Sequence, residues 1–139
     1  MLIISHRGNI EGPDAGLDNN PKHIKQLLDI GMHVEVDVWL IVDDLYLGHD
    51  APTYKITLDY LKHSNLWCHA KNLEALVQLL ENKVHCFWHE NDDFTLTSNN
   101  IIWTYPGKLT TNKSVIVDTS DNWRNKEYQS FGVCVDYVN

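Results

Sequence analysis

The chain has 139 residues, of which 43% are hydrophobic and 22% charged, a composition typical of a globular domain and not of a disordered segment. A formal net charge of −8 argues against a basic surface that follows a nucleic-acid backbone. Three cysteines without a CxxC spacing argue against a disulfide framework or a zinc knot and favour reduced thiols in a cytoplasmic protein.

Strand-like and helix-like segments alternate in the first part of the chain. Residues 2–8 (LIISHRG) predict a short buried strand, and their apolar stretch is too short for a signal peptide. A polar loop then leads to Asn20, a favourable helix N-cap, and to Pro21 at the first helical position. Residues 33–42 (HVEVDVWLIV) predict the next strand, and a turn leads into another over 45–50.

The rest of the chain has two more helix starts and a closely spaced run of strands. Thr57 caps a short helix, residues 66–71 predict a strand, and Asn72 caps a further helix. The helix after Asn72 has the i, i+3, i+4, i+7 spacing of a buried face, formed by Leu73, Leu76, Val77 and Leu80. Further strands are predicted over 84–90, 101–107, 115–120 and 132–138, with a shorter one over 95–99. No run reaches transmembrane length and no linker divides the chain, so we expect one domain over residues 1–139.

Two carboxylates interrupt the second predicted strand. Side chains two positions apart share a face, so Glu35 and Asp37 point away from Val34, Val36 and Val38, which suit packing under a helix. Two adjacent carboxylates repel each other, and one of them keeps its proton unless a cation neutralises the pair. Carboxylate oxygens favour Mg²⁺, Ca²⁺ or Mn²⁺. The same spacing also fits the hydrated face of an antiparallel strand.

Basic residues end the strands on either side of this acidic pair. His6 and Arg7 end the first predicted strand, and His49 ends the strand that follows the acidic one. Parallel sheets bind ligands at the carboxyl ends of their strands, so we expect these three residues to converge with Glu35 and Asp37 on one rim. The alternative is that the histidines are hydrogen-bonded structural residues at strand ends.

In their order and separation these motifs resemble the glycerophosphodiester phosphodiesterase family, which belongs to the phosphatidylinositol-phospholipase-C-like phosphodiesterase superfamily. The motifs are HRG, an Asx-Asn-x-Pro stretch, ExD and HD, at residues 6–8, 18–21, 35–37 and 49–50. The resemblance implies a TIM barrel, which usually needs about 250 residues. We therefore expect an α/β fold: a reduced or incomplete TIM-type (β/α) barrel with a mostly parallel sheet and few helices. A second copy of the chain, as a homo-oligomer, would cover the sides that missing helices leave open.

The resemblance also assigns the metal ligands, with one departure from the family pattern. Where the family has Glu-x-Lys, this chain has His69, Ala70 and Lys71, so the lysine is kept and the glutamate is replaced. Glu35 and Asp37, with His69 as third ligand, would then hold a divalent ion, Mg²⁺ or Ca²⁺, with Mn²⁺ favoured by the imidazole. The alternative for His69 is a buried histidine with satisfied hydrogen bonds.

The remaining roles follow from the same resemblance. His6 and His49 would form the acid–base pair, because an imidazole suits either role near neutral pH. Arg7 would offer a bidentate fork to the phosphate, or it would form a structural ion pair with Asp50 or Glu35. Lys71 would add a point charge, or it would be a surface lysine. Residues 88–93 (WHENDD) follow a strand and would be either an extra ligand or substrate contact or a hydrated loop.

These roles predict metal-dependent hydrolysis of a small, soluble glycerophosphodiester-type phosphodiester by two histidines. A phospholipase-D-like lyase that forms a cyclic phosphate is an alternative within the same superfamily. A degenerate barrel that binds a phosphorylated glycan or headgroup without turnover is an alternative from another class. None of the three requires a nucleic acid or a membrane span.

Overall fold

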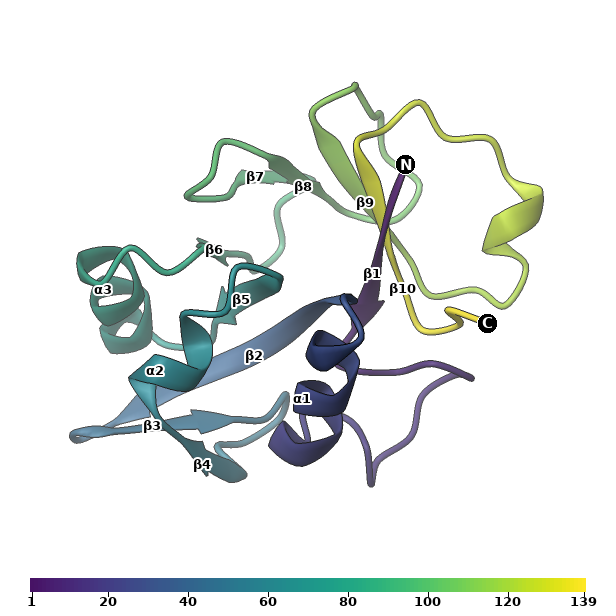
Figure 1. Cartoon of the computed structure of the whole chain (residues 1–139). Coiled ribbons are helices and arrows are strands. Elements are labelled where there is room, and N and C mark those ends of the chain that lie inside the picture. Colours follow the sequence, from purple (N-terminus) through teal and green to yellow (C-terminus); the bar gives the residue numbers. More distant parts are fainter.

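Figure 1 shows the computed structural model, which describes all residues from Met1 to Asn139. The apolar and β-branched segments form ten strands of one sheet, and the sheet curls into an open half-barrel in the view of Figure 1. The strands are β1 Leu2–His6, β2 His33–Ile41, β3 Asp44–Leu47, β4 Tyr54–Ile56, β5 Leu66–Ala70, β6 Cys86–Trp88, β7 Phe94–Leu96, β8 Ile102–Thr104, β9 Ser114–Asp118 and β10 Gly132–Val135.

Each of the three α-helices begins at the cap residue that the sequence predicts. The helices are α1 Pro21–Asp29, α2 Leu58–Leu61 and α3 Leu73–Glu81, and a 3₁₀ turn, η1, spans Trp123–Asn125. The side chains of Asn20, Thr57 and Asn72 accept hydrogen bonds from backbone N–H groups in the first turns of these helices. None of the helices combines the length and the hydropathy that crossing a membrane requires.

Parallel pairing joins seven strands in the order β6, β5, β2, β1, β10, β9 and β8. Antiparallel pairing adds β3 beside β2, β4 beside β3, and β7 beside β8. The sheet is therefore mixed, and the expected mostly parallel TIM-type barrel is not confirmed. The physical reason lies in the short connections: the few residues between β2 and β3, and between β7 and β8, permit a hairpin but not a helical crossover.

The valine face of β2 lies in the larger core, as its alternation predicts. Val34, Val36 and Val38 are fully buried in an apolar cluster that also contains Ile24 of α1 and Leu79 of α3. Burying such side chains contributes about 1.5–3 kcal/mol each relative to exposing them. This packing fixes which way the opposite, acidic face of β2 points.

A second apolar cluster fills the concave side of the curled sheet below the acidic face. It contains Trp67, Phe87 and Trp103, and the Phe87 and Trp103 rings stack with their centroids 4.5 Å apart. All three cysteines of the chain are buried and free. The concave side of the sheet is thus closed by aromatic packing and carries polar groups only toward the strand ends.

The buried face predicted for α3 is wrong. Leu73, Val77 and Leu80 are exposed, whereas Ala75 and Leu79 are the buried residues of this helix. The sequence of α3 is apolar on more than one face, so its spacing fits two orientations. The small side chain of Ala75 lets the helix approach the sheet closely.

Candidate functional site

A cavity of about 490 Å³ lies at the carboxyl ends of the parallel strands. The structure brings together on its wall every side chain that the sequence singles out for the site: His6, Arg7, Glu35, Asp37, His49, His69 and Lys71. The opposite wall has an aromatic and acidic character and includes Trp88, His89, Glu90, Trp103 and Tyr105. With Val117 of β9, residues from seven strands or strand ends therefore share one cavity.

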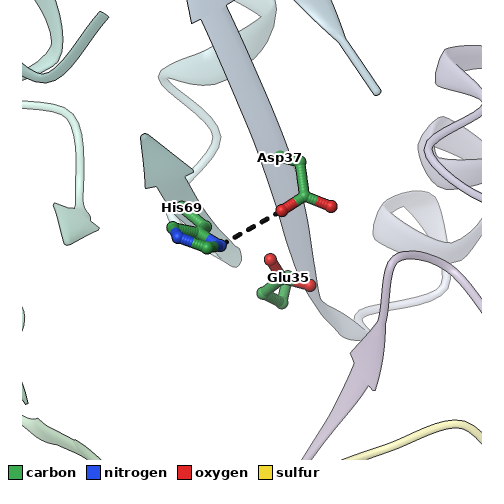
Figure 2. A group of neighbouring side chains, drawn as sticks. All are labelled: Glu35, Asp37 and His69. Carbon is green, nitrogen blue, oxygen red and sulfur yellow. Dashed lines mark ion pairs between the residues drawn. The ribbon is translucent and has the colours of Figure 1, made fainter. Parts of the chain in front are cut away.

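Asp37 is buried and held by three neighbours. Asn19 Nδ2 donates to Asp37 Oδ2 at 3.0 Å, and Asn19 Oδ1 accepts from the Asp37 backbone N–H at 2.9 Å. His69 Nδ1 lies 3.1 Å from Asp37 Oδ1, as Figure 2 shows, and Arg7 Nε lies 3.5 Å from Asp37 Oδ2. Burial alone would raise the pKa of Asp37, but the hydrogen bonds and charges of these neighbours lower it to about 2. Asp37 is therefore ionised at neutral pH.

Glu35 lies on the same face of β2 in a contrasting environment. Its side chain is buried, and Glu35 Oε2 has no hydrogen-bond partner. The nearest basic atom paired with it, His6 Nε2, is 3.8 Å away. Burial and the negative charge of Asp37 raise the pKa of Glu35 well above its ordinary value. Burial and the charge of Asp37 thus favour the neutral form of Glu35, and a bound cation would favour its charged form.

Glu35, Asp37 and His69 form the one group of side chains in the chain that could hold a metal ion. One potential ligand atom from each lies within 4.8 Å of the others, and in Figure 2 the three side chains point toward one another from β2 and β5. His69 Nε2 lies 3.0 Å from the backbone carbonyl oxygen of His89. This contact fixes the ring with Nδ1 facing Asp37, where a metal ion could take the place of the hydrogen shared by the two groups.

Two further histidines in the cavity are oriented by carboxylates. His6 Nδ1 lies 2.8 Å from Asp136 Oδ1, and Asn9 Nδ2 donates to the same oxygen at 2.9 Å. Burial would raise the pKa of Asp136, but the hydrogen bond from His6 lowers it below its ordinary value. His49 Nδ1 lies 2.7 Å from Asp50 Oδ1, although His49 is 38% exposed and Asp50 96%. The His6 contact is therefore the better protected of the two.

Two cations lie beside the acidic pair. Arg7 follows β1 in the left-handed region, with a φ of 58°, and its Nη1 lies 3.8 Å from Asp18 Oδ2. Gly8 continues this turn with a φ of 88°, and a Cβ there would lie 3.1 Å from Ile24 Cγ1, which explains the need for glycine in HRG. Lys71, just after β5, lines the same cavity and pairs with no carboxylate. Arg7 and Lys71 thus face the cavity from opposite edges of β2.

The sequence suggests a family-like inward carboxylate at Asp136, in the last strand, and places Asn19 in the Asx-Asn-x-Pro stretch, but it does not predict the contacts by which these two residues position the site. Asn19 was noted only as part of a motif, yet its side chain fixes Asp37 at two points. Asp136 follows β10, the parallel neighbour of β1, and so lies beside His6 at the end of β1. A prediction that β1 and β10 are neighbours would have identified this pair.

Comparisons of the chain with protein-family models, with curated proteins and with solved structures found no match.

Proposed function

We propose that the chain is a metal-dependent phosphodiesterase that hydrolyses a small phosphodiester of the glycerophosphodiester type. The observation that carries this proposal is the buried pair Glu35 and Asp37 beside His69, with an oxygen of Glu35 that has no hydrogen-bond partner. A buried carboxyl group in this state costs free energy, because its oxygen is neither hydrated nor hydrogen-bonded. A divalent cation bound to the unpartnered oxygen of Glu35 would remove that cost.

The residues present fit such a cation. Glu35 and Asp37 offer carboxylate oxygens, and His69 offers an imidazole nitrogen whose ring is fixed by the His89 carbonyl group. This donor set suits Mg²⁺, Ca²⁺ or Mn²⁺. When bound, the cation supplies positive charge that polarises the phosphoryl oxygens.

Arg7 and Lys71 would bind the non-bridging oxygens of the substrate phosphate. Arg7 lines the cavity with a partly exposed side chain, and its guanidinium group can offer N–H donors to a ligand oxygen while Nε faces Asp37. Lys71 adds a charge from the edge of β2 that carries β5. The net negative charge of the chain does not prevent phosphate binding, because the positive charges next to the phosphate determine its binding energy.

His6 and His49 are the acid–base pair in this proposal. The Asp136 carboxylate on His6 Nδ1 directs the other ring nitrogen, Nε2, into the cavity. Hydrolysis adds one water: its oxygen bonds to phosphorus, the bond from phosphorus to the leaving oxygen breaks, and a monoester and an alcohol result. The imidazoles move the protons that these two events release and require.

The half-barrel is, in this proposal, a reduced form of the (β/α) barrel, which is supported by the seven parallel strands and by the cavity at their carboxyl ends. We also propose a cytoplasmic location, which the three free buried cysteines support. The substrate is then a soluble small molecule.

Turnover of bis(p-nitrophenyl) phosphate and of a panel of glycerophosphodiesters, with Mg²⁺, Ca²⁺ or Mn²⁺, tests the proposal. We expect turnover that EDTA abolishes and that His6→Ala and Asp37→Asn each lower by at least about 100-fold. His63→Ala, which removes an exposed histidine outside the cavity, is the matched control. Phosphorus NMR of the product separates a linear monoester from a cyclic phosphate. Metal binding that needs Glu35 and Asp37 but yields no turnover would favour the binding domain instead.

A further inference from the structure

His89 is a third imidazole of the cavity that is oriented by a carboxylate. Its Nδ1 lies 2.6 Å from Asp92 Oδ1, and the second oxygen of Asp92 accepts from the Glu90 backbone N–H at 3.0 Å. This second contact fixes the carboxylate, so the ring of His89 is fixed as well. His89 Nε2 has no hydrogen-bond partner in the protein, and the residue lines the cavity. At 17% exposure, His89 is less exposed than His49.

The histidines of the cavity lie on two sides of β2. The Arg7 N–H donates to the Glu35 carbonyl oxygen at 2.9 Å, and the Gly48 N–H donates to the Asp37 carbonyl oxygen at 3.1 Å. Carbonyl groups two residues apart point to the same strand edge, so the ends of β1 and β3, with His6 and His49, lie along one edge of β2.

The other edge of β2 carries β5 and then β6. The Lys71 N–H donates to the carbonyl oxygen of Val38, which points opposite to that of Asp37. His69 on β5 and His89 just after β6 therefore lie on the far side of the acidic pair from His6 and His49. His69 is occupied by Asp37 and by the His89 carbonyl group, which leaves His89 as the available imidazole on this side.

We propose that His89 is a further catalytic residue of this cavity, which donates its Nε2 proton to the leaving alcohol. The inference rests on the proposed phosphodiesterase function. In-line displacement at phosphorus places the attacking and leaving oxygens on opposite sides of the phosphorus. In this inference His89 therefore takes over from His49 the role of acid for the leaving oxygen, and His49 stays with His6 on the side of the attacking water.

One proton leaves the attacking water and one proton reaches the leaving oxygen in this step. Water attacks phosphorus and gives a proton to His6, while the bond to the leaving oxygen breaks and its electron pair stays on that oxygen. The leaving oxygen takes the proton of His89 Nε2 and departs as a neutral alcohol. Solvent returns the proton from the His6 side to His89, so the residues start the next turnover unchanged. Asp92 stabilises the protonated ring before the transfer and keeps its contact with Nδ1 afterwards.

Substrates that differ only in their leaving group test this role. An alkyl leaving group needs a proton to depart, whereas p-nitrophenolate departs without one. His89→Gln is therefore expected to lower turnover of a glycerophosphodiester with an alkyl leaving group by about 100-fold or more, with a less than fivefold effect on bis(p-nitrophenyl) phosphate. His6→Ala is expected to lower turnover of both substrates, because it acts on the attacking water. Asp92→Asn is expected to share the selectivity of His89→Gln with a smaller loss.

His63→Ala is the control, and thermal unfolding of every variant checks that the chain is folded. Equal losses on both substrates for His89→Gln would overturn the inference, since a structural effect through His69 does not select leaving groups. Wild-type turnover of both substrates by a folded His89→Gln variant would also overturn it and leave the phosphodiesterase function standing. Absence of metal-dependent turnover in the wild-type chain, with His6→Ala no different, would reject the proposed function itself and this inference with it.

Discussion

Glu35 and Asp37 lie two residues apart on the same face of β2, yet their pKa values move in opposite directions. Asp37 is surrounded by donors and has a pKa of about 2, whereas Glu35 has an orphaned oxygen and a pKa well above the ordinary value. The difference comes from the neighbours, because both side chains are buried to nearly the same extent, at 2% and 1% exposed. The neighbours thus favour the charged form of Asp37 and the neutral form of Glu35, although only Val36 separates the two in the strand.

Replacing Glu35 by glutamine is expected to stabilise the metal-free chain at neutral pH. The folded pKa of Glu35 is raised, so the unfolded chain loses this proton first, and stability falls as pH rises above about 4.5. Glutamine keeps the shape without the titration, and we expect a gain on the order of 1 kcal/mol. Thermal unfolding in EDTA between pH 5 and pH 8 measures it. A Glu35→Gln curve that runs parallel to that of the wild type across this range would contradict the pKa direction.

Removing the Asn19 side chain is expected to loosen Asp37. Asn19 has a φ of 55°, which glycine adopts without strain. Asn19→Gly therefore keeps the backbone conformation and deletes both hydrogen bonds to Asp37. We expect a loss of about 1–3 kcal/mol of stability and of about 10- to 100-fold in metal affinity. Asn100→Gly is the matched control, because Asn100 has a φ of 65° and lies on an exposed turn. Equal effects of the two substitutions on metal affinity, measured by calorimetry, would rule out a positioning role for Asn19.

Asp118 is expected to stabilise the fold in a defined pH range. Burial raises its pKa, but hydrogen bonds from Lys126, Ser120 and Tyr128 outweigh this and lower it to about 2. Because the folded pKa lies below the ordinary 3.8, the stabilisation is present above pH 4 and is lost as pH falls toward 2. Asp118→Asn should cost about 2 kcal/mol at pH 7 and almost nothing near pH 2 in urea unfolding. Asp43→Asn, on an exposed turn, should show no such convergence.

His85 is expected to weaken the fold in mild acid. Burial lowers its pKa from 6.5 to about 4, so the unfolded chain takes up this proton before the folded chain does. Stability is therefore fully present above about pH 6.5 and declines as pH falls toward 4. The decline should be shallower in His85→Gln, which can still pair with Thr97, than in the exposed-site control His63→Gln. Identical pH slopes for the two variants would show that His85 does not titrate in this range.

The helix starts and the faces of β2 could be predicted because they depend on local chemistry. Asn20 and Asn72 cap helices by side chains that reach the next turn, and alternation alone separates Val36 from Glu35. The open sheet and the orientation of α3 depend on how distant segments pack, which the periodicity of one segment does not contain. The pairing of His6 with Asp136 likewise requires knowing that the first and last strands are neighbours.

The three-way pairing of β2 has a mechanical consequence for the acidic pair. β1 pairs with residues 33–35 of this strand, β5 with residues 34–38 and β3 with residues 38–41, so a shift by one residue would break all three ladders together. The same shift would turn Glu35 and Asp37 into the apolar core and expose the valines. The two carboxyl groups therefore cannot relieve their repulsion by sliding. The strand pairing holds them at a fixed separation before any ligand binds, so the site is preformed. The stability of the sheet offsets the unfavourable free energy of keeping the two groups close together.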